Sequence, residues 1–354
     1  MLNALYFCIL GTVCFLISLP IFIYISKNNF PEYKISKDPW VYMWGGSFFV
    51  VSVLYFVLPD MQDIIVNVEY RNIFISFILA ALIYVAYVVE IKWLLSSLIV
   101  ISAAVVTYLI PDNVLIFEKQ IPFIYDRLIV FSAILLVTFF AKILNGLSGI
   151  FGIFMLTGLC GSMLVSLVGG LPLSYGFIAS ALVGLWLAFL RYNWYPSEVE
   201  LSDGACCSAA FLLCCFFVCA SCEFAGSSVL VLLAYIFAEI LWVVVRKYIL
   251  RIQEPYLSNN TAYYSSYVKD INIYAILVSV AKIGVINVIF SAFQVYSINS
   301  FSIPVFSLVV DLWLLNMLYN AGEKELTLKE TNEAIINEVK NSIKTIGDTL
   351  KKGK

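Results

Sequence analysis

Residues 150–190 read IFGIFMLTGLCGSMLVSLVGGLPLSYGFIASALVGLWLAFL and contain no charged side chain. They hold two apolar runs, 150–169 and 172–190. Each run is close to the length of about 20 residues that a helix needs to cross a bilayer. Similar runs cover 2–26, 40–58, 72–89, 93–110, 125–143, 206–223, 227–245, 272–291 and 301–319. The sequence therefore predicts an all-α fold, a polytopic integral membrane helix bundle with about eleven transmembrane helices.

The composition agrees with a membrane location. Of 354 residues, 62% are hydrophobic and 12% are charged, and the mean hydropathy is +0.96. A soluble domain carries about 25% charged residues, so this chain could not cover its surface in water. The formal net charge of −2 argues against a nucleic-acid partner. Histidine is absent, which removes imidazole as a base or metal ligand.

The distribution of positive charge predicts the orientation, because Lys and Arg accumulate in cytoplasmic loops. If the N-terminus lies outside, the outer loops hold only Arg71, Lys119 and Arg127. The inner loops then hold Lys27, Lys34, Lys37, Lys92, Lys142, Arg191, Arg246, Lys247, Arg251 and Lys269. We therefore expect the N-terminus outside and the C-terminus in the cytoplasm. The first run has no positive start and no small-residue cleavage site, so we expect a permanent helix rather than a signal peptide.

The chain divides into a transmembrane domain, 1–320, and a polar tail, 321–354. Apolar residues in the tail recur at spacings of three and four, which predicts a cytoplasmic amphipathic helix: Ile336, Val339, Ile343, Ile346 and Leu350. This helix could dock on its own protein or on lipid headgroups, or it could form a short coiled coil.

Two charged residues fall within the last two predicted helices. Lys282 and Asp311 each lie about ten residues into their helix, from opposite sides, so both are expected near the midplane. An unpaired charge there is costly, which predicts a salt bridge between them, with Glu239 as a third partner. A proton or ion relay is the alternative.

The loop after the run 172–190 contains polar and aromatic residues and ends at Asp203. A carboxylate at a helix start is favoured by capping and by the helix dipole. Alternatively, Asp203 could bind Mg²⁺, which takes one or two carboxylates and completes its shell with substrate phosphates.

This loop resembles a signature of the polyprenyl-phosphate N-acetylhexosamine-1-phosphate transferases (glycosyltransferase family 4). That family includes the undecaprenyl-phosphate GlcNAc-1-phosphate and phospho-N-acetylmuramoyl-pentapeptide transferases. The signature runs roughly F-x-x-Y/F-N-x-x-P-A-x-V-F-M-G-D-x-G-S. The matching residues are Phe189, Tyr192, Asn193, Pro196, Val199 and Asp203. The residues that depart from it are Glu200, Leu201, Ser202, Gly204, Ala205 and Cys206.

Two further loops resemble the same family, in order and on the same predicted side. The stretch N-G-L-S-G at 145–149 lies where the family has D-G-x-D-G, with Asn145 and Ser148 in place of the aspartates. Glu90 lies where the family has an Asp-Asp pair. The family's late loop, rich in histidine and arginine, corresponds to 246–270, where Arg246 and Arg251 remain and histidine is missing.

The resemblance implies a transferase that moves a sugar-1-phosphate from a UDP-sugar to undecaprenyl phosphate in the bacterial inner membrane, initiating a lipid-linked cell-envelope glycan. It implies Glu90 and Asp203 as catalytic residues and ligands of a weakened Mg²⁺ site. It implies substrate contacts from Asn145, Ser148, Asn193, Arg246 and Arg251. Membrane lipid and a second copy of the chain, in a homodimer, are further implied partners.

An inactive protein of the same fold is the alternative, because three of about five family carboxylates are replaced, and one lost stabilising group commonly costs about 10²–10³ in rate. Such a protein would bind polyprenyl phosphate or an active partner transferase. A transporter or flippase is a third class, although no inverted repeat is visible in the sequence.

Overall fold

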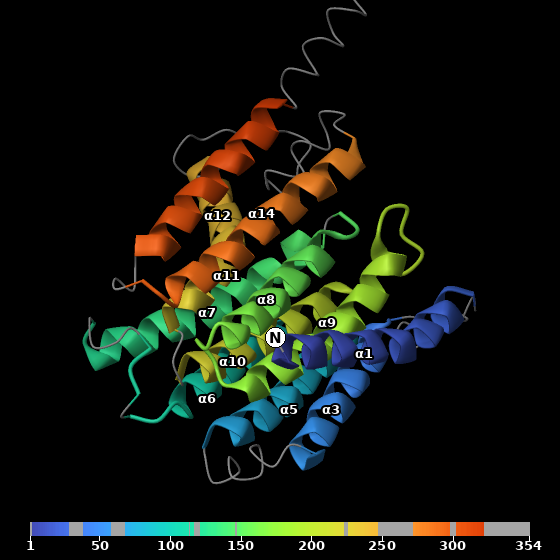
Figure 1. Ribbon diagram of the computed structural model, residues 1–354, viewed down its shortest axis with the longest axis horizontal. Helices are drawn as coiled ribbons and strands as arrows, with labels where there is room; N and C mark the ends of the chain where they lie inside the picture. Colours follow the sequence, from blue (N-terminus) through green and yellow to red (C-terminus); the bar gives the residue numbers. More distant parts are fainter. Residues whose placement is uncertain are drawn as a thin grey trace, which may run out of the picture.

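The computed structural model describes residues 2–27, 38–57, 68–112, 114–116, 121–145, 147–222, 226–246, 272–297 and 302–321. These residues form 12 helices, which confirms the predicted all-α class (Figure 1). The helices are α1 (Leu2–Lys27), α3 (Trp40–Val57), α5 (Val68–Val88), α6 (Lys92–Tyr108), α7 (Phe123–Leu144), α8 (Ile150–Leu167), α9 (Leu173–Asn193), α10 (Asp203–Ala220), α11 (Gly226–Leu232), α12 (Ala234–Val244), α14 (Ile273–Gln294) and a last helix, Ser302–Ala321. The predicted tail helix and Arg251 lie outside the described residues.

Each predicted apolar run coincides with a helical segment. Seven helices are long and apolar enough to cross a membrane, and four shorter apolar helices accompany them. The shorter helices cover Trp40–Leu54, Asn72–Val88, Trp93–Tyr108 and Ala234–Val244. The run 227–245, predicted as one helix, is divided into α11 and α12 at Leu233. This pattern supports a multi-pass membrane protein.

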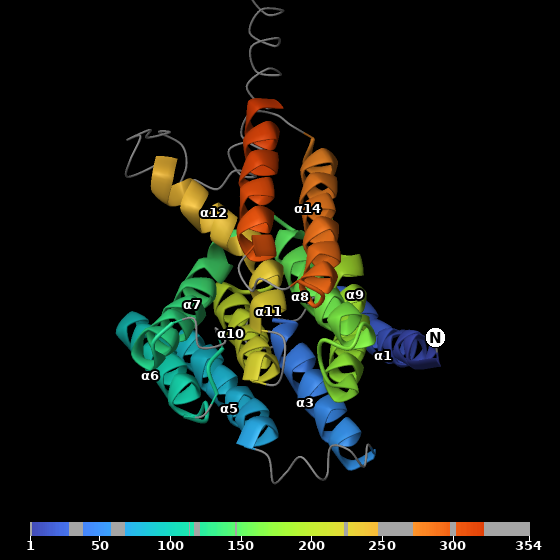
Figure 2. The same ribbon diagram turned by 60° about the vertical axis from the view of Figure 1, so that its left-hand side comes forward.

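Helix α10 lies at the centre of the bundle, packed between α5 and α7 and touching α8 and α11 (Figure 2). Of its 18 residues, 15 are buried. Most of them are Ala, Cys, Ser or Gly, whose small side chains allow helices to approach closely. Ser208 Oγ, for example, donates to the carbonyl oxygen of Ala80 on α5 at 2.6 Å. The five buried cysteines of α10 are free thiols that fill space between helices.

Among the described helices, α1 and α9 make the most extensive contact. On α9, Gly176, Ser180 and Gly184 recur at every fourth position and so line one face. The hydroxyl of Ser180 donates to the carbonyl oxygen of Phe7 on α1. A Cβ atom at Gly184 would collide with the carbonyl oxygen of Gly11. The two backbones therefore touch, as in small-xxx-small contacts between membrane helices.

Helix α14 and the last helix lie side by side along the same edge of the molecule (Figures 1 and 2). Asn287 Nδ2 donates to Asp311 Oδ2 at 2.8 Å, and Ser307 Oγ donates to Asn287 Oδ1 at 2.6 Å. All three side chains are fully buried. A polar contact between neutral and acidic groups thus joins the two helices where the sequence predicted an ion pair.

The predicted salt bridge between Lys282 and Asp311 is wrong. Lys282 is exposed, whereas Asp311 is buried against Asn287. Residues 282 and 287 are five positions apart on α14, which places them about 140° apart around the helix axis. Glu239, the expected third partner, is buried on α12 and accepts from the Tyr235 hydroxyl at 3.4 Å.

Candidate functional site

The loops after α7 and α9 are joined by hydrogen bonds at one end of the bundle, hereafter the loop end. Asn145 Nδ2 donates to the carbonyl oxygen of Leu201 at 2.8 Å. Asn193 is buried and bridges both loops. Its Oδ1 accepts from Gly149 N at 2.9 Å, and its Nδ2 donates to the carbonyl oxygen of Val199 at 2.9 Å. The predicted site residues Asn145 and Asn193 therefore both link the loop after α7 to the loop after α9.

Ser148 extends the same network toward the surface. Its hydroxyl donates to Ser197 Oγ at 3.0 Å and to Glu200 Oε1 at 3.3 Å, and Ser197 donates to Glu200 Oε1 at 2.7 Å. Gly149 has a φ of +93°, which glycine adopts without strain, at the N-cap of α8. Gly149, the last residue of N-G-L-S-G, thus permits the turn in which its own N–H donates to Asn193 Oδ1.

Glu90 occupies the tight turn between α5 and α6 with a φ of +64°, the only positive φ of a non-glycine residue in the described part of the chain. The left-handed region is uncommon for such a residue and costs about 1–3 kcal/mol. Glu90 is exposed and lines a cavity of about 430 Å³, together with Asp38, Tyr84, Tyr87 and Ser202. Strain at a cavity wall is typical of functional positions.

Asp38 is a second carboxylate on this cavity, and the sequence reasoning missed it. Its side chain is buried just before α3, where Oδ1 accepts from Trp40 N at 3.0 Å. The hydroxyls of Ser202 and Tyr84 also hydrogen-bond to this carboxylate. Burial raises the pKa of Asp38, and these hydrogen bonds partly oppose the rise. The one available signal was an Asp-Pro pair directly before an apolar run.

Asp203 begins α10 beside this cavity. The N-cap is Ser202, whose Oγ accepts from Ala205 N at 3.1 Å, so the capping role considered for Asp203 belongs to its neighbour. Asp203 is exposed in the first turn, where the helix dipole favours a carboxylate. A Cβ atom at Gly204 would overlap the ring of Tyr87, so the start of α10 packs directly on the end of α5.

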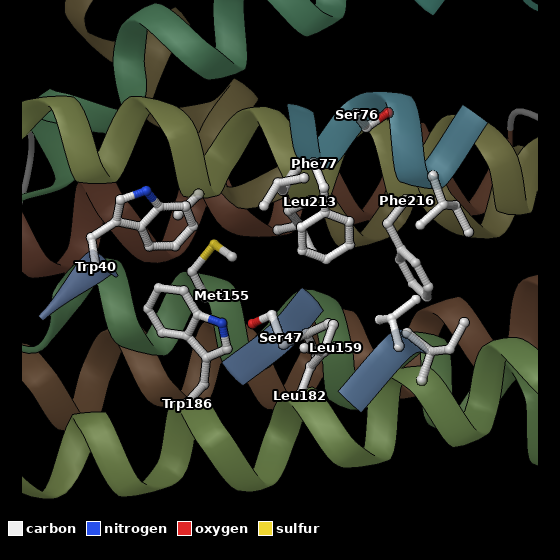
Figure 3. A pocket seen from close by; sticks show the side chains of 15 residues that line it. Trp40, Ser47, Ser76, Phe77, Met155, Leu159, Leu182, Trp186, Leu213 and Phe216 are labelled. Carbon is white, nitrogen blue, oxygen red and sulfur yellow. The ribbon is translucent and has the colours of Figure 1, made fainter. Parts of the chain in front are cut away.

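An apolar cleft leads from Trp40 into the bundle between α3, α5, α8, α9 and α10 (Figure 3). Trp40 and Trp186 lie near one end of the cleft and Phe216 lies near the other. Its two labelled hydroxyls bond within their own helices, Ser47 to the carbonyl oxygen of Met43 at 2.6 Å and Ser76 to that of Asn72 at 2.7 Å. The cleft is apolar but narrow, with a volume of about 50 Å³, and Trp40 at its end follows Asp38 by two residues.

Arg246, predicted to bind substrate, lies on a different pair of helices. Its guanidinium lies 3.9 Å from the ring centroid of Tyr319, its Nη2 donates to the Tyr319 hydroxyl at 2.8 Å, and Trp242 lies 5.6 Å away. These contacts join the end of α12 to the last helix. Whether Arg246 also reaches a substrate stays a prediction.

Two exposed carboxylates at the loop end, Glu90 and Asp203, are the candidate metal ligands. No group of three or more Asp, Glu, Cys or His side chains in the described residues could hold a metal ion. Mg²⁺, however, is commonly held by one or two carboxylates and by phosphate oxygens. Glu90 lines the cavity with Ser202, the residue before Asp203, and both carboxylates are exposed. A site in which Glu90 and Asp203 share one Mg²⁺ stays a prediction.

The pH dependence of stability should reveal the buried carboxylate. Because the pKa of Asp38 is raised in the folded protein, the folded state loses stability as pH rises from below about 4 through that raised pKa. Asp38→Asn cannot ionise, so its Tm should fall less than that of the wild type between pH 4 and pH 8. Tryptophan fluorescence during thermal unfolding in detergent measures both curves. Glu198→Gln controls for the lost charge, and parallel curves for Asp38→Asn and wild type would contradict this assignment.

At the loop end, three of the predicted substrate-contact residues, Asn145, Ser148 and Asn193, thus make hydrogen bonds between the loops after α7 and α9. Glu90 lines the nearby cavity, Asp203 follows its lining residue Ser202, and the structure adds Asp38, Tyr84 and Ser202. A scan against known protein families gives no match, and a search of curated proteins gives none either. The function must therefore be inferred from the residues and their geometry.

Proposed function

We propose that the chain crosses a bacterial inner membrane eleven times, with its N-terminus outside and the loop end in the cytoplasm. The charge asymmetry of the loops supports this orientation. The contacts between helix ends also agree with this topology. It places the ends of α5, α7 and α9 and the starts of α3, α8 and α10 on the cytoplasmic side, and the structure joins residues from these ends.

We propose further that the chain is a membrane transferase that moves a sugar-1-phosphate from a UDP-sugar to undecaprenyl phosphate. One observation carries this proposal: two of the loops that resemble the transferase family are hydrogen-bonded to each other. Glu90, in the third loop, lines a cavity together with Ser202, the residue before Asp203. Phosphoryl transfer depends mainly on positioning and charge neutralisation, which such an arrangement provides.

In this proposal Glu90 and Asp203 would hold Mg²⁺, which would supply positive charge to neutralise the diphosphate. Asn145, Ser148 and Asn193 fix the two loops that frame the substrate, and Arg246 and Arg251 attract the diphosphate. Asp38 lines the cavity wall, and burial raises the pKa of its carboxyl group above that of an ordinary aspartate.

An inactive binder of polyprenyl phosphate is the second candidate, and one observation favours it. Asn145 and Ser148 stand where the family has aspartates. The side chains of both residues hydrogen-bond to the loop after α9. Neither can contribute negative charge to a metal or activate an acceptor phosphate. The cavity of about 430 Å³ would remain, and with it the capacity to bind a lipid phosphate.

An exchange assay distinguishes the two. Purified full-length protein is incubated with undecaprenyl phosphate, Mg²⁺ and a panel of UDP-sugars, and UMP release is measured. The transferase proposal expects release that requires the lipid and stops on chelation of Mg²⁺. No release with any donor, together with a rise in Tm on adding undecaprenyl phosphate, would establish the inactive binder. Failure of both readouts would refute the family relationship.

A further inference from the structure

Lys282 presents a charge on the outer face of α14, inside the span. It is exposed, and its exposed neighbours on the same face are apolar, with Val278 46% and Val285 59% exposed. The tyrosines at the two ends of α14 set its depth. The ring of Tyr274 packs on Tyr195 of the loop end at 5.8 Å, while the Tyr296 hydroxyl donates to the carbonyl oxygen of Val168 at the opposite end of α8.

Tyrosine is enriched at membrane–water interfaces, and Tyr274 and Tyr296 are separated along α14 by about 33 Å, close to the thickness of the hydrocarbon core. Lys282 lies about 12 Å from Tyr274 along the axis. Its side chain leans toward the start of the helix, but four methylene groups cover only about half of that distance. The ammonium group therefore stays in the apolar layer, where an unpaired charge is costly.

Within the described residues, no ion pair joins Lys282 to a carboxylate. Three acidic side chains within the described helices are buried: Asp126 and Asp311 are 0% exposed and Glu239 is 2% exposed. Asp311 is turned away, toward Asn287. Since these three carboxylates are enclosed in each copy, a second copy of the chain does not present them to Lys282. This burial favours a counter-charge from a different molecule.

We propose that this face of α14 docks a transmembrane helix of another protein, and that this helix carries an aspartate or glutamate level with Lys282. Charge complementarity at low dielectric supports an acidic partner. The spacing of Val278, Lys282, Val285 and Ile289, alternating four and three, is the spacing at which two long helices pack side by side. This surface is separate from the loop end, so it does not depend on the transferase proposal.

A model helix tests the chemistry directly. The full chain, carrying an acceptor dye, is reconstituted in phosphatidylcholine vesicles with a donor-labelled polyleucine transmembrane peptide. One peptide has a single Asp at the depth of Lys282, and its control has Leu there. We expect the Asp peptide to associate on the order of tenfold more tightly than the Leu peptide. Lys282→Leu should abolish the difference, and Lys282→Arg should retain it.

A charge exchange excludes loss of folding as the explanation. The Lys282→Glu variant should no longer bind the Asp peptide in preference to the Leu peptide. It should instead prefer a matching peptide that carries Lys at the same depth. Equal binding of the Asp and Leu peptides to the wild type, or unchanged preference in Lys282→Leu, would overturn the proposal. Enrichment of spin-labelled phosphatidylglycerol that depends on Lys282, without any peptide preference, would assign the lysine to a lipid headgroup and would also overturn it.

Discussion

Gly184→Val is expected to separate α1 from α9 and to lower the free energy of unfolding by at least about 3 kcal/mol. A side chain at this position collides with the carbonyl oxygen of Gly11 and lies 2.9 Å from the backbone N of Phe15. Both atoms belong to the backbone, so no rotamer change relieves the overlap. The whole of α1 must move, and the hydrogen bond from Ser180 to Phe7 is then lost.

Unfolding by denaturant in micelles measures this loss, and thiol labelling locates it. Cys14 is 8% exposed in the packed pair and should react with a maleimide in Gly184→Val but not in the wild type. Gly45→Val is a matched control on α3, because a Cβ atom at Gly45 meets nothing within 4 Å. Equal destabilisation by the two substitutions would show that the α1–α9 contact is not responsible.

The second large effect concerns transfer. Asp203→Ala and Glu90→Gln should each lower UMP release by about 10²–10³-fold, as commonly follows removal of one transition-state-stabilising group. Glu90→Gly sharpens this prediction, because glycine adopts a φ of +64° without strain. This variant should be as stable as the wild type, or more stable, and yet be as inactive as Glu90→Gln.

A residue with a purely structural role would behave differently. If Glu90 merely filled the turn, Glu90→Gly would keep full activity and a higher Tm, and the proposed site would be wrong. Glu198→Gln is the control, since Glu198 is an exposed carboxylate in the loop after α9. It should release UMP at the wild-type rate. Comparable losses in Glu198→Gln and Asp203→Ala would point to the net charge of the loop instead of a specific role for Asp203.

Part of the candidate site could be predicted from sequence because neighbouring loops carry their own signals. Asn145, Ser148 and Asn193 flank glycine and proline in short polar stretches between apolar runs, and the structure joins them. Their role as links between loops was not predictable, because each one hydrogen-bonds to a group 44 to 56 residues away in the sequence. Asn193 also bonds to Val199 within its own loop. Asp38 escaped notice for the same reason, because its partner Ser202 is 164 residues distant.

The sequence alone determined the class of the fold and the places of the helices. Burial of backbone polar groups in lipid allows only helices or closed barrels, so a run of apolar residues of the right length specifies its own structure locally. Only the tertiary structure decided which face of each helix meets another. A rotation of about 140° between positions 282 and 287 separates a lysine that faces outward from the contact that encloses Asp311. Hydropathy measures how much of a helix is apolar, but the direction of a single charged side chain depends on the packing of helices that are distant in the chain.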